Sequence, residues 1–151
     1  MSLRTRFTDD LKTAMKAGDK ITLETIRLMI AKMKEADVNA RVGGKDIGDP
    51  EIVLLLQTMM KQRAESAKIY RDNARPELAD REEAEMRVIT TYLPAQLDAG
   101  AAAAAIAAII TELGAAGAKD MGRVMSAVKE KLAGQMDMSA ASSIVKSKLA
   151  G

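Results

Sequence analysis

Apolar residues recur every three or four positions through almost the whole chain, and this periodicity constrains the fold more than any other feature. Leu3, Phe7, Leu11 and Met15 form the first such stripe, which we expect to be the buried face of a helix. Seven stretches carry the pattern, and none shows the strict alternation of a half-buried strand. The sequence therefore predicts an all-α protein.

Capping residues mark where most of these stretches begin and end. Ser2, Asp19 and Asp98 have side chains that accept hydrogen bonds from the free N–H groups of a first helical turn. Gly18 and Gly114 suit the left-handed conformation that ends a helix. The predicted helices run from Ser2 to about Ala17, Asp19 to about Val38, Asp49 to about Asn73, Pro76 to Leu93, Ala99 to Leu113, Asp120 to about Ala133, and from Asp137 or Ser139 to Leu149.

A glycine-rich segment, 39–49, is predicted to be a loop. Its Gly43-Gly44-Lys45 sequence lacks the full spacing and the following Ser or Thr of a phosphate-binding loop, so a nucleotide site is not favoured. Asp49 followed by Pro50 predicts a helix start, with Asp49 as the capping residue.

Two groups of charged residues invite a functional interpretation. Four cations share one side of the third predicted helix: Lys61, Lys68, Arg71 and Arg75. They could follow a phosphate backbone, but Glu65 and Asp72 lie four residues after lysines and favour solvated pairs along the helix. Three carboxylates cluster on the fourth: Glu82, Glu83 and Glu85. They alternate with arginines, which favours an exposed charged face over acid–base or metal chemistry.

The composition narrows the chemistry further. The chain has no cysteine and no histidine, which removes Ser-His and Cys-His pairs, imidazole bases and nearly every zinc site. No spacing of the remaining residues suggests a nucleophile with its base, so we predict no catalytic residues, no cofactor and no metal ion. Aromatic residues are only 2%, so the core must consist of aliphatic, methionine and alanine side chains. The net charge of +2 permits an anionic partner without requiring one.

Pro94 separates two parts of the chain. The residue before a proline avoids the α conformation, so the fourth helix must stop near Leu93. An alanine-rich helix follows the proline, with isoleucines kept at helical spacing. We therefore predict a four-helix subdomain over residues 1–94 and a three-helix subdomain over residues 95–151.

The stretch 118–132, AKDMGRVMSAVKEKL, combines a predicted cap at Asp120, a glycine in the first turn and a basic side. Gly122 costs about 1 kcal/mol of helix stability relative to alanine. Either a partner approaches the backbone there, or Gly122 lets two helices pack closely. If Asp120 caps the helix, its charge occupies the N-terminal anion site, so an anion would be held by lysine and arginine side chains instead.

Four segments resemble the GatB/YqeY-like family: IRLMIAKMKEADV (26–38), KQRAESAKIYRDNARPELADREEAEMRVITTYLPAQL (61–97), KDMGRVM (119–125) and GQMDMSAASSIVKSKL (134–149). The resemblance covers essentially the whole chain and preserves the order of its segments. It implies a four-helix N-terminal part and a C-terminal part similar to the tail domain of the B subunit of tRNA-dependent amidotransferases. In those larger proteins the tail contacts the outer corner of tRNA.

Two departures from these relatives matter. The fifth helix carries alanines where relatives often have charged residues. The chain also lacks the amidase signature with its Ser-Ser-Lys triad and any kinase-like ATP site. The resemblance therefore implies an accessory protein rather than an enzyme, and amidotransferase activity (carbon–nitrogen ligation with glutamine as amido donor) would be assigned by homology alone.

The leading hypothesis is a non-catalytic module that binds tRNA through its C-terminal part. The residues expected to contact RNA are Lys119, Gly122, Arg123, Lys129, Lys131, Lys146 and Lys148. The alternatives are a protein–protein adaptor and a factor associated with an amidotransferase or an aminoacyl-tRNA synthetase. We expect neither a membrane nor DNA as a partner. The N-terminus has no apolar leader, and the sequence has no apolar stretch long enough to span a membrane. We therefore predict a cytoplasmic protein.

Overall fold

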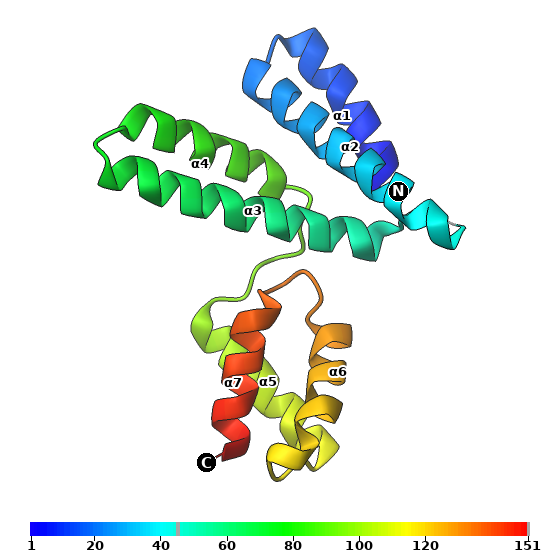
Figure 1. The fold of residues 1–151 in the computed structure, drawn as a ribbon, viewed down its shortest axis with the longest axis vertical. Helices are drawn as coiled ribbons and strands as arrows, with labels where there is room; N and C mark the ends of the chain where they lie inside the picture. The colour runs from blue at the N-terminus through cyan, green and yellow to red at the C-terminus, as the bar shows by residue number, and fades with distance from the viewer. Residues whose placement is uncertain (45, 151) are drawn as a thin grey trace. The chain divides into compact units, whose positions relative to one another are not determined.

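The computed structural model describes residues 1–44 and 46–150, apart from the side chain of Val42. It confirms the all-α prediction, with no strand in these residues (Figure 1). The helices are α1 (Leu3–Ala17), α2 (Lys20–Ala40), the 3-10 helix η1 (Arg41–Gly43), α3 (Asp49–Asp72), α4 (Pro76–Thr90), α5 (Ala99–Leu113), the 3-10 helix η2 (Ala118–Asp120), α6 (Met121–Lys131) and α7 (Met138–Ala150). Lys45, part of the Gly43-Gly44-Lys45 sequence, lies outside the described residues.

The chain divides into two compact units, Met1–Leu93 with α1–α4 and Pro94–Gly151 with α5–α7. That they are subdomains able to fold independently stays a prediction.

Most local helix signals act as expected. The side chains of Ser2, Asp19 and Asp98 accept backbone hydrogen bonds at the starts of α1, α2 and α5. Gly18 and Gly114 end α1 and α5 with φ angles of 68° and 63°, which are strained for residues that carry a Cβ atom. The α4 helix ends at Thr90, three residues before the expected Leu93.

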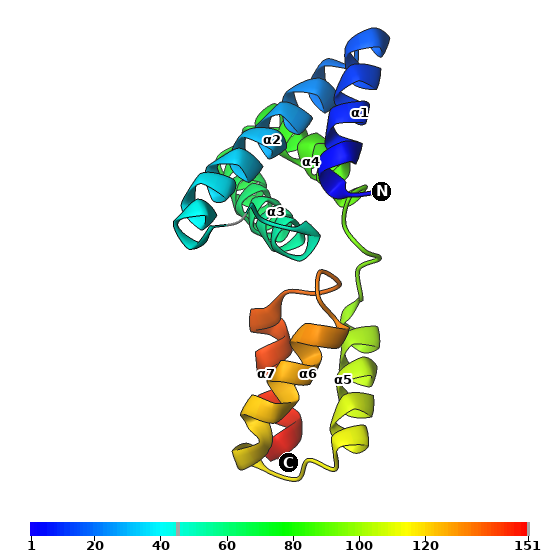
Figure 2. The same cartoon turned by 90° about the vertical axis from the view of Figure 1, so that its right-hand side faces the viewer.

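In the first unit, α1 and α2 form one helical hairpin and α3 and α4 form another (Figures 1 and 2). Phe7 is fully buried, and its ring packs edge-on against Tyr92 with ring centroids 5.0 Å apart. The core residues are Leu3, Phe7, Ile26, Met29, Met33, Ile52, Leu56, Met59, Ile89 and Tyr92. Met15, which we expected in the buried stripe of α1, is 55% exposed, and Ala14 is buried in its place.

A buried carboxylate joins the start of α1 to the end of α2 and the loop that follows. Asp37 accepts hydrogen bonds from the guanidinium of Arg4 and from the backbone N–H of Ile47. Arg4 also donates to the carbonyl of Ile47, 2.7 Å away. The Arg4 hydrogen bond lowers the pKa of Asp37 from 3.8 to about 2. This carboxylate therefore favours the folded state in its charged form.

Asp49 does not cap α3, so that prediction was wrong by one position. Gly48 is the capping residue, and the Glu51 carboxylate accepts a hydrogen bond from its N–H group, 3.0 Å away. The Asp49 carboxylate instead accepts a hydrogen bond from the N–H group of Leu3 at the start of α1. A tertiary contact thus outweighs the local one.

The charged groups of α3 and α4 pair mainly across the hairpin, and the predicted partners Glu65 and Asp72 form no ion pair with the lysines four residues before them among the described residues. Arg71 of α3 contacts Asp80 and Glu83 of α4. Arg63, only 8% exposed, donates from Nε to Glu85 of α4 at 3.0 Å and from a guanidinium nitrogen to the carbonyl of Met59. The predicted solvated face is therefore wrong for Glu85, whose side chain is only 18% exposed between the two helices, whereas Arg71 keeps 44% of its side chain exposed.

Arg81 extends this pairing to the other hairpin. Its guanidinium contacts Glu24 of α2 and also Glu85. Glu85 therefore serves both Arg63 and Arg81, and the network joins α2, α3 and α4. Partial burial and the Glu85 charge raise the pKa of the neighbouring Glu82.

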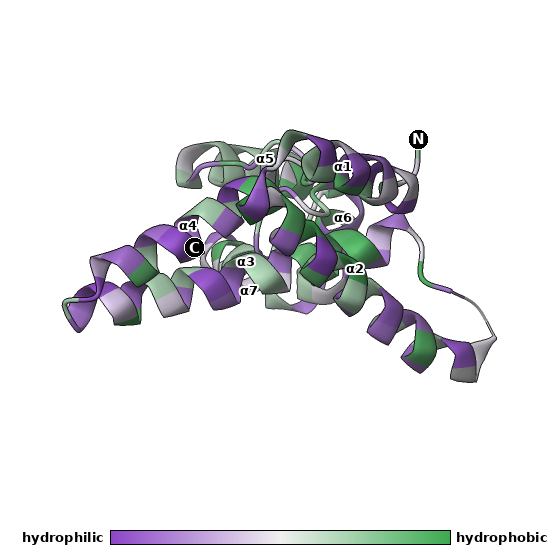
Figure 3. Cartoon of the chain, turned by 90° about the horizontal axis from the view of Figure 1, so that it is seen from above, coloured by the Kyte–Doolittle hydropathy of each residue, from purple (hydrophilic) through white to green (hydrophobic). Residues whose placement is uncertain are grey.

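The second unit is a three-helix bundle with an aliphatic core. The core residues are Ala102, Ile106, Ile109, Val124, Val128, Leu132, Met136, Ala141, Val145 and Leu149. In Figure 3, α5 is apolar along most of its length, whereas α4 mixes polar and apolar residues. No single helix in the described part of the chain is long and apolar enough to cross a bilayer; α5 and α6 meet that test only together, as a pair bent by 96°.

Candidate nucleic-acid interface

The start of α6 differs from the prediction at Asp120. The residue precedes α6 in a helical conformation, φ −90° and ψ 0°, and its side chain makes no capping hydrogen bond. The carboxylate instead accepts a hydrogen bond from the N–H group of Ala116, 3.0 Å away, in the loop before η2. That hydrogen bond, helped by the charge of Arg123, lowers the pKa of Asp120. Asp120 therefore organises the α5–α6 connection.

Arg123 fastens α6 to the end of α5. Its guanidinium donates to the carbonyl of Leu113, 3.0 Å away, and to Asp120 at 3.3 Å. The carbonyls at the C-terminal end of a helix lack partners within it, so a cation is favourable there. About half of the Arg123 side chain is still exposed. Its first role is therefore structural, although the exposed part can still meet an anion.

Gly122 faces open space. Apart from its chain neighbours and the adjoining backbone of α6, a Cβ atom added to it would meet no described atom within 4 Å. The residue is exposed and lies inside a helix, where alanine is more favourable. The interpretation that Gly122 lets two helices of this unit pack closely is therefore wrong, and no contact within the unit requires a glycine there.

The lysines of this region fall into two groups. Lys131 forms an ion pair with Glu112 of α5, with 2.6 Å between the ammonium and a carboxylate oxygen. Lys119 and Lys129 are exposed and form no ion pair with any residue that the structure describes. Arg123 and Lys131 therefore hold α5, whereas Lys119 and Lys129 are available to a partner.

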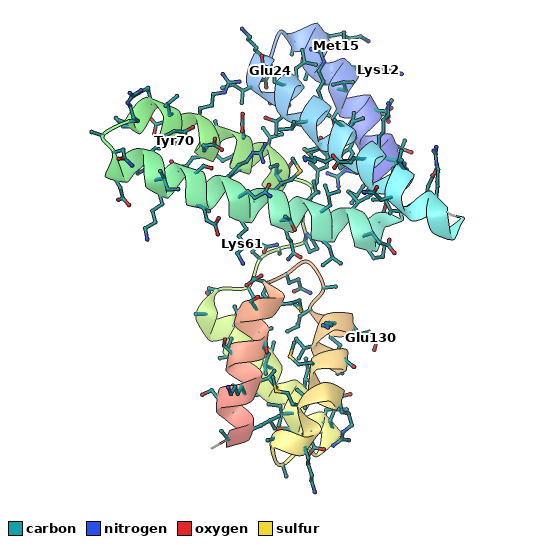
Figure 4. All side chains as sticks on the ribbon, viewed as in Figure 1. Lys12, Met15, Glu24, Lys61, Tyr70 and Glu130 are labelled. Atoms are coloured by element: carbon teal, nitrogen blue, oxygen red, sulfur yellow. The ribbon has the colours of Figure 1, made fainter. Side chains whose placement is uncertain are left out.

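The available residues lie in a row. Residues four and seven positions apart share one side of a helix, which places Ser126 and Lys129 in line with Gly122. All three are exposed, and Lys119 lies in the turn just before them. We call Lys119, Gly122, Ser126 and Lys129 the α6 outer face. Glu130 is exposed beside it (Figure 4), and its charge offsets part of the positive potential.

The two lysines of α7 do not share a face. Lys146 and Lys148 are exposed, but at about 100° per residue they are about 200° apart around the helix. The C-terminal end of α7 lies beside the start of α6 (Figures 1 and 2), and η2 packs against α7. At most one of the two lysines can therefore extend the basic surface around Lys119.

Sequence reasoning missed two residues here, Ser126 on the α6 outer face and Glu130 beside it. The spacing of Ser126 from Gly122 could have found the first, because two small residues four apart leave a smooth strip on a helix. Among the described residues there is no group of three or more Asp or Glu side chains that could hold a metal ion.

The fold and this surface define an all-α protein whose second unit presents a narrow basic strip around an open stretch of helix backbone. The family model described as Yqey-like protein matches residues 4–149. The chain therefore belongs to the YqeY-like family, as the resemblance in its sequence indicated.

Curated relatives come from yeasts. The protein named altered inheritance of mitochondria protein 41, mitochondrial, from Lachancea thermotolerans is 34% identical over 84 residues, which cover 56% of this chain and 44% of the relative. Its namesake from Vanderwaltozyma polyspora is 37% identical over 86 residues, with 56% and 44% covered. The match thus spans less than half the length of these relatives.

These relatives contradict the predicted cytoplasmic location, because their names place them in mitochondria. The prediction rested on the lack of an apolar leader and of a membrane-length segment. Neither feature distinguishes one aqueous compartment from another, and mitochondrial targeting segments are amphipathic rather than apolar.

Proposed function

We propose that the second unit is a non-catalytic RNA-binding module with tRNA as its ligand, acting as an accessory in tRNA metabolism. The observation that carries the proposal is Gly122, whose backbone is open to solvent and lies between two lysines, Lys119 and Lys129, that form no ion pair in the described part of the chain. The resemblance of this region to the tail of the amidotransferase B subunit supports the same ligand.

The α6 outer face contributes little to the packing of its own unit. Gly122 weakens α6 and makes no contact that requires glycine, and Lys119 and Lys129 form no ion pair among the described residues. An RNA backbone would use these features, because its phosphates attract lysines and a helix without a Cβ atom allows close approach. Such contacts depend on shape and charge and carry little base information, which suits a chain with few aromatic residues.

The experiment is a titration of labelled total tRNA at two salt concentrations. Lys119→Ala/Lys129→Ala is the informative variant, because neither lysine forms an ion pair with a residue that the structure describes. Replacing Arg123 would also remove its contacts with Leu113 and Asp120. We expect the double variant to bind about 5 to 150 times more weakly and to lower the salt dependence by about 1.5 in slope.

Lys32→Ala/Lys34→Ala on α2 is the matched control, since it removes the same charge from the other unit. Its binding should follow the loss of net charge only, with a change below about twofold. Failure of the unaltered protein to bind tRNA at low salt would contradict the proposal, as would an equal loss in the control.

We propose as the second candidate that the protein also contacts an amidotransferase or an aminoacyl-tRNA synthetase, as a protein–protein adaptor. The same resemblance supports it, since the tail domain in those relatives belongs to larger enzymes. Co-purification of such an enzyme after ribonuclease treatment would favour the adaptor over direct RNA binding.

A further inference from the structure

The two units are joined by a short non-helical connection, residues 91–98, between α4 and α5 (Figure 1). The connection closes the longest segment of family resemblance, and neither a hydrophobic core nor the proposed RNA contact accounts for the glutamine in it, Gln96. Each end of the connection is fixed by contacts inside one unit. The backbone freedom left between the two ends can therefore be counted.

The connection is fixed to the first unit as far as Leu93. Tyr92 is buried, and its hydroxyl donates a hydrogen bond to the Asp10 carboxylate. The N–H group of Leu93 donates to the carbonyl of Thr90, 3.1 Å away, and the Leu93 side chain packs against the first core. Leu93 therefore moves with the first unit.

Gln96 ties the other end of the connection to the second unit. Its Nε2 donates hydrogen bonds to the carbonyl of Gly134 in the α6–α7 loop, 2.6 Å away, and to the carbonyl of Pro94, 2.8 Å away. We call these two hydrogen bonds the Gln96 clasp. Next to it, the N–H group of Leu97 donates to the carbonyl of Gln135, and the Leu97 side chain packs against the second core. One side-chain amide thus uses both of its N–H donors to hold the connection against the loop.

The clasp leaves few backbone torsions of the connection free to turn. The ring of Pro94 fixes its own φ and confines the preceding residue, Leu93, to extended conformations. The hydrogen bond from Gln96 to the Pro94 carbonyl spans Ala95 and so restrains ψ of Pro94 and both torsions of Ala95. Ala95 is exposed and forms no hydrogen bond with any residue that the structure describes. Opening the clasp therefore releases these three torsions together.

We propose that the Gln96 clasp controls how far the two units can turn relative to each other. With the clasp closed, rotation is confined to the junction of Leu93 and Pro94. With the clasp open, rotation extends over residues 93–96. Gln96 is exposed, so water or a partner can compete for its amide without disturbing either core. The device depends only on contacts of the connection and does not rest on RNA binding.

The test is double electron–electron resonance on the full chain with one spin label in each unit. The chain has no cysteine, so Lys34→Cys on α2 and Ser147→Cys on α7, both at exposed positions, can be labelled selectively. We expect Gln96→Ala to widen the distribution of distances between the labels by about 1.5-fold or more, because three torsions are released. Gln96→Glu should widen it similarly at neutral pH, since an ionised carboxylate keeps the shape of the side chain but only accepts hydrogen bonds.

Gln62→Ala is the matched control, because it removes the same side chain at an exposed position of α3, and it should leave the width unchanged. Circular dichroism verifies that each variant keeps its helices. An unchanged width in Gln96→Ala would overturn the proposal, as would an equal widening in the control. The proposal would also be overturned if Gln96→Glu kept the width of the unaltered protein, since the amide donors would then not be what holds the connection.

Discussion

The two units of this protein use their charges differently. In the first unit, Arg4, Arg63, Arg71 and Arg81 each contact carboxylates on another helix, and two of those carboxylates, on Asp37 and Glu85, are largely shielded from solvent. In the second unit, an aliphatic core holds three helices together. Among its described residues, ion pairs form only at Asp120–Arg123 and Glu112–Lys131.

This difference explains where binding surfaces can arise. Charges that hold helices together are not available to a partner, because moving them would expose or strand a buried group. The second unit does not need Lys119 or Lys129 for its packing and so can present them. In the first unit, cations without an ion pair among the described residues are spread over several helices, such as Lys34 on α2, Lys61 on α3 and Arg87 on α4.

The largest expected effect is a loss of stability when a buried side chain is shortened in either core. Ile106→Ala and Ile26→Ala each remove a fully buried isoleucine, one from each unit, and should cost about 2–4 kcal/mol of unfolding free energy. If the units fold separately, hydrogen exchange should show lost protection only in the unit that carries the change. Lost protection across the whole chain in both variants would contradict the predicted pair of subdomains.

The next effect tests the dependence of the first unit on its charges. Arg63→Ala leaves Glu85 without a partner from α3 in a site where both side chains are less than one fifth exposed. We expect a loss of about 2–3 kcal/mol in urea unfolding. Arg71→Ala, whose side chain is 44% exposed, should lose much less. Similar losses in the two variants would show that burial of the pair is unimportant.

A smaller effect should appear at Gly122, with opposite signs for stability and binding. Gly122→Ala should raise stability by up to about 1 kcal/mol, because nothing in the unit blocks the added methyl group. The same change should weaken tRNA binding if the backbone of Gly122 meets RNA. Gly100→Ala in α5, where the added atom makes only an ordinary contact, is the matched control and should leave RNA binding unchanged.

The smallest expected effect appears only at acidic pH and concerns the contribution of Asp37 to the unfolding free energy. Its pKa is lowered in the folded protein to about 2 from 3.8, so its stabilising contribution is complete above about pH 4. That contribution should be lost as the pH falls through about 2. Asp37→Asn should flatten the pH dependence of the unfolding free energy between pH 4 and 2, measured by chemical denaturation. If the unfolding free energy of Asp37→Asn depended on pH as that of the unaltered protein does, the charged Asp37 carboxylate would not be the source of this dependence.

The candidate interface was only partly predictable from the sequence. The pattern identified α6 and its open glycine, and the structure leaves Lys119 and Lys129 available beside it. It did not reveal that Arg123 and Lys131 turn toward the end of α5, since their partners Leu113 and Glu112 precede a loop whose path no local rule sets.

What the sequence determined by itself was local. The starts of α1, α2 and α5 and the ends of α1 and α5 depend on hydrogen bonds between residues three to five apart and on the left-handed freedom of glycine, so nearby residues suffice to predict them. The apolar period then set the helix faces, with errors such as Met15 near a helix end.

Only the tertiary structure decided which partners the charged residues bind. Asp49 could cap its own helix but instead binds the N–H group of Leu3, 46 positions away, and Arg63 finds Glu85 22 positions away. Competing partners of similar strength surround such groups in the sequence. The choice between them depends on which helices pack together, because burial strengthens whichever contact it encloses.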